Sequence, residues 1–411
     1  MSWPKTSHNA GETILNAGWV YPMSAPPIRD GAVVIAGDRI LDLGPSLEIS
    51  KRYPGAQTVD LTNCTLLPGL VNAHTHLELS LVPRPPAVAP GGFVGWLEQI
   101  IAAQTDPVAA VYQGGEQCLR FGVTTVGDIS RQPDIVRPIL RDSPLRVVSF
   151  GEVSAMAKRR ALLDDRLGKA ADSRFQSPRL QTGISPHAPY SIEADGYRLS
   201  LQTAQQNKFP LTTHLAETPF EAAFLSHHTG PFRDLWNSLD GWDDQVQGYN
   251  GGPIRFAQSL GLLNYPTLLA HVNYCDNEEL KILARGRASV VWCPRTHDYF
   301  GHPPHRWQAM HARGINIAVG TDSCASSGDL NLVDDLRLIH RQSPEVPPDH
   351  LWRLVTTRAA KALGLSDGCG ILAKDSFADI VAFSTTSDDP LTEILENPIL
   401  PLATWAAGSR F

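Results

Sequence analysis

The feature that most constrains this chain is a pair of histidines, His74 and His76, at the end of an apolar stretch that reads LLPGLVNAHTHLE. Side chains on a β-strand alternate with a period of two, so both imidazoles are expected on one face of the strand. Two imidazoles at a strand end form half of a typical metal site. The motif alone is weak, since a surface strand can carry two histidines without binding a metal. Its weight comes from polar residues that follow later apolar runs.

The middle of the chain alternates between short apolar runs and helical patterns. Runs such as VTTVGDI, LRVVSFGEV and INIAVGTDS suit parallel strands that are buried on both faces, whereas NEELKILARG and LWRLVTTRAAKALG have helical periodicity. Eight strand–helix units over residues 67–366 predict an α/β fold, a (β/α)8 TIM barrel. A doubly wound sheet is the alternative, but no G-x-G-x-x-G follows a strand.

The two ends of the chain predict a second, smaller domain. Residues 1–66 contain short strand patterns separated by turns, with a single helix expected over residues 46–53. Residues 367–411 return to strand patterns in ADIVAFST and LATWAAGSRF. These two segments flank the alternating middle, so we expect one composite β-sandwich domain that is formed by residues 1–66 together with residues 367–411.

Charge and cysteine usage exclude several classes of partner. The net charge is −7 and no basic cluster is present, which argues against nucleic acids and anionic membranes as partners. No apolar run approaches the length of a membrane span, and the first residues lack the apolar core of a signal peptide. The six cysteines include no C-x-x-C pair, so reduced thiols in a cytoplasmic protein are expected.

Chemistry-bearing side chains recur where the predicted barrel strands end. His187 follows the fourth strand, His214 the fifth, His271 the sixth and Asp322 the eighth, and Glu217 lies three residues after His214. Enzymes with this fold carry their chemistry at the carboxyl ends of the strands. A lone histidine there is commonly structural, but the ordered set predicts a metal site.

The motifs that carry these residues, in this order, resemble the amidohydrolase superfamily: PGLVNAHTH, SPHAPYS, THLAE, AHV, CPRTH and VGTDS. The resemblance covers nearly the whole chain and also implies a barrel with a β-sandwich built from both termini. It implies the metal ligands His74, His76, His214 and Asp322. It further implies catalytic roles for three residues: His271 contacts the metal-bound water or the substrate, Glu217 shuttles protons, and Asp322 both ligates and accepts a proton. His187 matches a substrate-contacting position.

An absence within the resemblance bears on the number of metal ions. Binuclear members carry a lysine at the end of the fourth strand, and that lysine bridges two metals after carboxylation. Here the corresponding segment reads TGISPHAP, while Lys208 is expected to be a solvated residue at a helix end. One divalent ion is therefore expected. Imidazole and carboxylate ligands favour Zn²⁺, with iron or manganese as alternatives.

The subgroup that this chain resembles most is the branch of deaminases and triazine hydrolases, and within it the adenosine-type deaminases such as aminodeoxyfutalosine deaminases. This implies a small N-heterocyclic substrate, release of ammonia and a homodimer. A metal lowers the pKa of water toward about 7, and a carboxylic acid such as Glu217 can then protonate a ring nitrogen. Hydrolysis of a cyclic amide or an aryl halide on the same scaffold is the alternative. A non-catalytic scaffold ranks last, because every expected ligand position is filled.

Three further residues are candidate substrate contacts. Glu78 could accept a hydrogen bond in the pocket or face solvent, and Trp96 could stack on a base or belong to the core of a helix. Arg295 could hold a polar substrate tail or pair with an acidic neighbour. His297 stands where relatives often have asparagine. The remaining histidines nearby, His302, His305 and His311, are expected at the surface.

Overall fold

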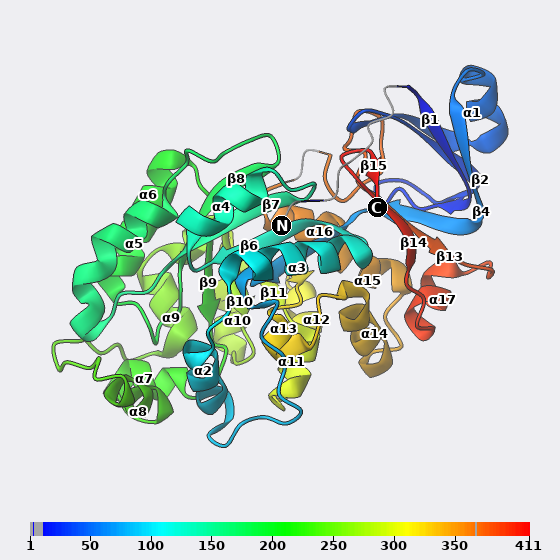
Figure 1. Cartoon of the computed structure of the whole chain (residues 1–411). Helices are drawn as coiled ribbons and strands as arrows, with labels where there is room; N and C mark the ends of the chain where they lie inside the picture. Colours follow the sequence, from blue (N-terminus) through cyan, green and yellow to red (C-terminus); the bar gives the residue numbers. More distant parts are fainter. Residues whose placement is uncertain (1–2, 4–10, 366–367) are drawn as a thin grey trace.

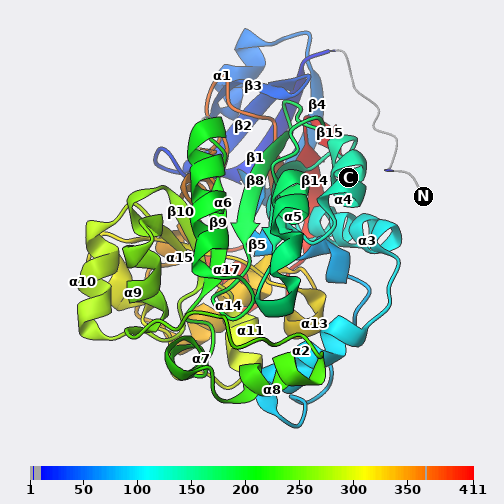
Figure 2. The same cartoon turned by 90° about the vertical axis from the view of Figure 1, so that its left-hand side faces the viewer.

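A computed structural model describes residue 3, residues 11–365 and residues 368–411. The described chain forms two parts, a barrel with surrounding helices and a separate sheet that contains strands from both ends of the chain (Figure 1). In the view turned by 90°, the sheet again lies at one side of the barrel (Figure 2). This is the predicted α/β fold, a TIM barrel with a smaller β domain.

The barrel is a sheet of eight parallel strands in the order of the sequence. Its strands are β5 (Leu70–Thr75), β6 (Val123–Ser130), β7 (Arg146–Val153), β8 (Leu180–Pro186), β9 (Leu211–Leu215), β10 (Thr267–His271), β11 (Ser289–Trp292) and β12 (Asn316–Val319). The main helices between them are α3 (Pro107–Arg120), α4 (Pro133–Arg141), α5 (Leu163–Ala170), α6 (Ala194–Asn207), α9 (Gly252–Ser259), α10 (Asn277–Arg285), α11 (Pro294–Tyr299) and α12 (Trp307–His311), and α13 (Cys324–Ser327) and α14 (Leu332–Gln342) follow the last strand.

Strand alternation divides the apolar residues of the barrel into an inner and an outer set. On β7, Val148 and Phe150 belong to the inner cluster, whereas Val147 and Val153 belong to the cluster beneath the helices. The inner cluster also contains Leu363, which follows α16 (Thr357–Ala362). The barrel interior is thus filled by side chains, as in other barrels of this size.

The terminal sheet is a single mixed sheet of seven strands in the order β15-β14-β13-β4-β1-β2-β3. Its strands are β1 (Thr13–Val20), β2 (Ile28–Ala36), β3 (Arg39–Pro45), β4 (Gln57–Pro68), β13 (Ile380–Ser384), β14 (Pro401–Ala406) and β15 (Ser409–Arg410). Ile40 from β3 and Trp405 from β14 share one apolar cluster, although their strands lie far apart in the sheet order. The sheet therefore curls around its own core. The expected helix is α1 (Ser46–Arg52), which covers the outer face.

The limits of the smaller domain stay predictions. β4 continues to Pro68, and β5 begins two residues later at Leu70. The expected boundary between residues 366 and 367 lies outside the described residues. One helix expected from LWRLVTTRAAKALG is two, α15 (Pro348–Leu354) and α16, because the chain leaves helical geometry at Thr356 (φ −131°).

Several helices lie outside the eight regular units. These are α2 (Gly92–Ala102), α7 (Glu221–His227), α8 (Pro231–Ser238) and α17 (Pro390–Glu396). Both views show α2 and α8 side by side at the same end of the barrel (Figures 1 and 2). Phe93 and Trp96 from α2 pack in one apolar cluster with Phe232 and Trp236 from α8. Among the described helices, none has the length and hydropathy that a membrane crossing requires.

Candidate metal centre and pocket

Three histidines and an aspartate converge where β5, β9 and β12 end. The nitrogens of His74, His76 and His214 lie within 4.8 Å of one another, and all three side chains are buried. Asp322 completes the group, with Oδ1 at 3.4 Å from Nε2 of His76 and at 4.0 Å from Nε2 of His74. Strand period places the first two imidazoles on one face, and the parallel barrel brings the other two residues to the same end.

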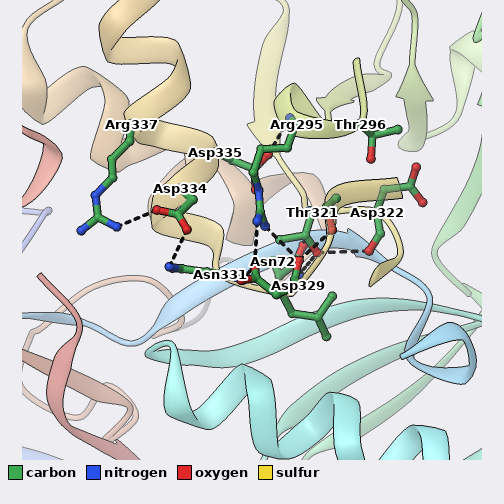
Figure 3. A network of polar contacts seen from close by, with 12 residues as sticks. Asn72, Arg295, Thr296, Thr321, Asp322, Asp329, Asn331, Asp334, Asp335 and Arg337 are labelled. Carbon is green, nitrogen blue, oxygen red and sulfur yellow. Dashed lines mark hydrogen bonds and ion pairs between the residues drawn. The ribbon is translucent and has the colours of Figure 1, made fainter. Parts of the chain in front are cut away.

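A close seam between the first and the last strand brings Asp322 to the two histidines of β5. A Cβ at Gly320 would lie 2.7 Å from the carbonyl oxygen of His74, so only glycine permits this approach. The side chain of Asn72 donates to Oγ1 of Thr321 at 2.7 Å and accepts from its backbone N–H at 3.0 Å (Figure 3). The backbone N–H of Asp322 donates to the carbonyl of His74 at 3.0 Å. These bonds fix the ligand loop across the seam.

The polar atoms of this cluster have the character of metal donors. Neither ring nitrogen of the fully buried His74 has a hydrogen-bond partner, and such an orphan costs about 1–3 kcal/mol unless something satisfies it. His214 donates from Nδ1 to the carbonyl of His187 at 3.0 Å, which leaves the Nε2 lone pair facing the cluster. Burial lowers the pKa of His214 to about 3, so the ring stays neutral, as a ligand must be. The cluster fits one divalent cation.

A second group of three side chains adjoins the first. Oε1 of Glu217 lies 3.2 Å from Nε2 of His271, and Oε2 accepts a hydrogen bond of 2.9 Å from the hydroxyl of Tyr190. Burial is the largest cause that raises the pKa of Glu217 well above its usual range, and the neighbouring carboxylates of Asp322 and Glu221 raise it further. The sequence did not single out Tyr190, although the hydroxyl stands inside the quoted motif SPHAPYS.

The loop that carries Glu217 is held by another residue that sequence reasoning missed. Glu221, at the start of α7, accepts from the backbone N–H groups of Ala216 at 2.9 Å, Glu217 at 2.5 Å and Thr218 at 3.0 Å. Ala216 has φ of 51°, a left-handed conformation that side chains disfavour. The only available signal was an acidic residue in a first helical turn, which is common without any function.

A cavity of about 340 Å³ opens beside both groups. Its apolar wall comes from α2 and α8 and includes Phe93, Trp96 and Trp236. Trp96 also donates from Nε1 to the carbonyl of Ala325 at 3.0 Å, so it lines the cavity from a fixed position. His187 also lines the cavity, with Nε2 at 3.9 Å from Oε2 of Glu152.

Part of the lining of this cavity is rich in guanidinium groups. Arg131, Arg159 and Arg166 all line it, together with Glu152. Within the described part of the chain, none of the three arginines forms an ion pair with a carboxylate. Arg159 lies over the ring of Trp236 at 5.4 Å instead. With three guanidinium groups and one carboxylate, this part of the lining carries an excess of positive charge in a chain whose net charge is −7.

The structure corrects two of the expected substrate contacts. Glu78 does not line the cavity, since its buried carboxylate accepts from the backbone N–H groups of Arg131 at 2.5 Å and Gln132 at 3.2 Å. Arg295 is also remote from the cavity and pairs with Asp335 at 2.9 Å and Asp329 at 2.5 Å (Figure 3). A buried guanidinium needs such partners, and acidic residues on α14 and in the preceding loop supply them.

The three histidines expected at the surface are partly exposed, and each makes a polar contact. His305 is only partly exposed and donates from Nε2 to the carbonyl of His271 at 2.9 Å. His302 is likewise partly exposed, with Nδ1 at 3.0 Å from the hydroxyl of Tyr274. His311 lies next to Arg358, at 2.8 Å between Nδ1 and a guanidinium nitrogen. The sequence around these histidines is polar and rich in proline, and such a pattern does not predict these contacts.

Comparison with known proteins identifies the family. Residues 65–408 match the amidohydrolase family, which is most of the chain, so the chain belongs to that family. A curated relative, the aminodeoxyfutalosine deaminase of Deinococcus radiodurans, is 27% identical over 351 residues, which cover 81% of each chain.

Two solved structures show the same fold. The aminofutalosine deaminase of Helicobacter pylori has a TM-score of 0.85 at 23% identity, with 97% of this chain and 100% of that chain covered. It has also been solved in complex with methylthio-coformycin. An adenosine deaminase from Xanthomonas campestris, solved with bound zinc, has a TM-score of 0.80 at 23% identity and covers 97% of this chain and 92% of its own.

Proposed function

We propose that this chain, as a hydrolase of the amidohydrolase family, deaminates the base of an adenine-type nucleoside such as aminodeoxyfutalosine and releases ammonia. The observation that carries this proposal is the position of Glu217. Its carboxyl group, whose pKa is raised mainly by burial, adjoins the cluster of three histidines and an aspartate and faces a cavity of about 340 Å³. Similarity to the aminodeoxyfutalosine deaminase of Deinococcus radiodurans supports the same reaction.

The proposed ligands of one divalent cation, Zn²⁺ in our proposal, are His74, His76, His214 and Asp322. Three neutral imidazoles and one carboxylate are a donor set that suits zinc and leaves room for a further ligand. A divalent cation, when bound, supplies Lewis acidity that lowers the pKa of water toward about 7. Asp322 accepts a proton from the attacking water, because its buried carboxylate lies at the same place.

Glu217 moves the proton on which deamination depends. The reaction adds the oxygen of water to the ring carbon that carries the amino group and breaks the bond from that carbon to the amino nitrogen. Glu217 first donates its proton to the adjacent ring nitrogen, so that attack places no negative charge on the heterocycle. As the attacking oxygen becomes the carbonyl oxygen of the product, Glu217 takes up its remaining proton and passes it to the leaving amine, and the proton held by Asp322 restores Glu217. His271, 3.2 Å from Glu217, orients the attacking water.

The cavity favours a nucleoside with a large substituent over a free base. Its aromatic wall, with Phe93 and Trp96, offers apolar surface on which rings can stack. Arg131 and Arg159 in the cavity lining favour a carboxylate or another anionic group on that substituent, because a guanidinium can bind such a group through two parallel hydrogen bonds.

The test is turnover of a substrate panel by zinc-loaded protein. Adenosine, methylthioadenosine, S-adenosylhomocysteine, aminodeoxyfutalosine, guanine and cytosine are incubated separately, and ammonia and the ultraviolet shift are followed. We expect ammonia from nucleosides, with the highest kcat/KM for one that carries an anionic substituent. Activity confined to free bases would contradict the nucleoside assignment. Hydrolysis of a cyclic amide or an aryl halide without ammonia from any member would contradict deamination.

The metal assignment has a separate test. Elemental analysis of protein that was expressed with added zinc should give one ion per chain. Two tightly bound ions per chain would contradict the mononuclear site.

A further inference from the structure

The segment after β11, from Cys293 to Arg306, lies behind the catalytic pair rather than in the substrate cavity. It contributes three histidines, His297, His302 and His305, and none of them lines the cavity. The ring of His297 lies 5.3 Å from that of His302 and 5.7 Å from that of His305. The family assignment of metal ligands and proton shuttle leaves this histidine-rich segment without a role.

The backbone conformation of His271 is held by contacts from outside strand β10. Its φ is 72° and that of Val272 is 50°, two consecutive left-handed residues at the end of β10. Each such residue costs about 1–3 kcal/mol and persists only where the surroundings impose it. His305 donates from Nε2 to the carbonyl of His271 at 2.9 Å, and its ring stacks on Trp292 at 4.8 Å with an interplanar angle of 7°. The stacked ring therefore fixes the donor that holds the strained backbone.

His297 reaches the other catalytic residue through one intermediate side chain. Asn273 donates from Nδ2 to the carbonyl of Glu217 at 3.0 Å, so its Oδ1 faces Nδ1 of His297 at 3.0 Å. Nε2 of the same ring lies 2.8 Å from the carbonyl oxygen of Pro303, so each ring nitrogen faces an acceptor, and a neutral ring with its proton on Nδ1 donates to Asn273. In that tautomer His297 holds Asn273, which in turn holds the backbone of Glu217.

We infer that His297 and His305 are positioning residues for the reaction, one for each catalytic residue. His305 acts through the backbone of His271, and His297 acts through Asn273 on the backbone of Glu217. The inference rests on the proposed roles of Glu217 and His271. Because neither histidine touches the cavity or the four proposed metal ligands, their loss should reduce the rate of the chemical step without weakening the binding of substrate or metal.

Paired substitutions separate positioning from simple stabilisation. His305→Leu and His297→Leu remove the donors, whereas His305→Gln keeps an N–H near the Nε2 position and His297→Asn keeps one near the Nδ1 position. His302→Leu is the matched control, because this histidine belongs to the same segment, its side chain hydrogen-bonds only to Tyr274 among the described residues, and the substitution keeps its backbone N–H bond to the carbonyl of His297. We expect each leucine variant to lose about 10–100-fold in kcat at unchanged KM and metal content. The glutamine and asparagine variants should recover most of that loss, and the control should match wild type.

Two outcomes would overturn the inference. One is a leucine variant with wild-type kcat. The other is a loss of kcat that tracks the loss of melting temperature and is not recovered by the conservative variants. A crystal structure of the His305→Leu variant gives a readout independent of turnover. The carbonyl of His271 should shift and its ring should move away from Glu217, and unchanged positions would contradict the role.

Failure of the proposed function would show separately. If wild type hydrolysed another bond instead of deaminating a nucleoside, the same ratios of kcat would be measured on that reaction.

Discussion

The mouth of the barrel and the terminal sheet differ in where residues with left-handed backbone occur. At the mouth, the left-handed residues Ala216, His271 and Asp322 all stand at strand ends beside the candidate site. In the terminal sheet, the left-handed Ala407 lies in the tight turn between β14 and β15, followed by Gly408. This turn uses left-handed backbone to reverse the chain, whereas the mouth uses it to direct side chains toward the site.

The two regions also differ in how their buried polar groups are hydrogen-bonded. At the mouth, buried ring nitrogens of His74, His76 and His271 lack hydrogen-bond partners. In the sheet, buried hydroxyls such as those of Thr65 and Thr385 bond to each other at 2.8 Å. At the mouth, unsatisfied buried groups and left-handed backbone thus occur where a ligand would compensate them. Substitutions in the two regions should accordingly separate activity from stability.

Removal of a proposed ligand should have the largest effect on activity. Asp322→Asn keeps the size of the side chain but removes the carboxylate charge, so we expect loss of both bound metal and detectable turnover. Elemental analysis and ammonia release measure these two quantities, and His74→Ala should give the same result. A variant that kept one metal ion per chain and wild-type turnover would remove Asp322 from the ligand set.

Glu217→Gln should have the next largest effect. The amide cannot shuttle a proton, so kcat is expected to fall by roughly 10²–10⁴-fold while the metal content stays unchanged. Steady-state kinetics with parallel metal analysis provide the measurement. Normal turnover by this variant would refute the proposed proton transfer, whereas loss of metal would make Glu217 a ligand.

Tyr190→Phe should reduce kcat moderately. The variant keeps the ring that stacks on Phe232 at 4.1 Å but loses the hydrogen bond to Glu217. Glu217 becomes a charged carboxylate once it has given up its proton, and a hydrogen bond to a charged group contributes about 1.5 kcal/mol or more, which corresponds to about a tenfold change in rate. The expected result is a fall in kcat of that order, with little change in melting temperature. If Tyr190 acts through Glu217, the double variant with Glu217→Gln should show no further decrease in kcat. A further decrease would mean that Tyr190 acts independently of Glu217.

Arg159→Met should change the choice of substrate more than the rate. Methionine can still cover the ring of Trp236 but carries no charge. We expect KM to rise about tenfold for a nucleoside with an anionic substituent, which is the loss of about one charge-assisted hydrogen bond, and to stay unchanged for adenosine. If KM rose equally for both substrates, the arginine would not recognise the anionic group.

Ile40→Ala should have the smallest effect on activity. Ile40 is fully buried in the core of the terminal sheet, and its truncation is expected to cost about 2–5 kcal/mol in the free energy of unfolding. Denaturant unfolding measures this loss, and kcat per folded chain should match wild type. A selective fall in kcat would show that the two regions are not energetically separate.

The sequence alone was sufficient for the barrel, the terminal sheet and the convergence of the two clusters. A period of two places His74 and His76 on one face, and parallel strands in a barrel bring His214, His271 and Asp322 to the same end. These inferences need only the strand pattern and the direction of the strands, which local sequence contains. Family resemblance then attached roles to those positions, and the roles stay proposals.

Only the tertiary structure decided which side chains face the cavity from the loops. Glu78 and Arg295 have the chemistry of substrate contacts, but they turn away to a backbone loop and to Asp335. His305, in a polar segment, instead holds the strained carbonyl of His271. The direction of a loop side chain depends on partners that are remote in sequence, and burial penalises every polar group that lacks one. Strand periodicity carries no information about those partners, so this part of the site emerged only when the chain was folded.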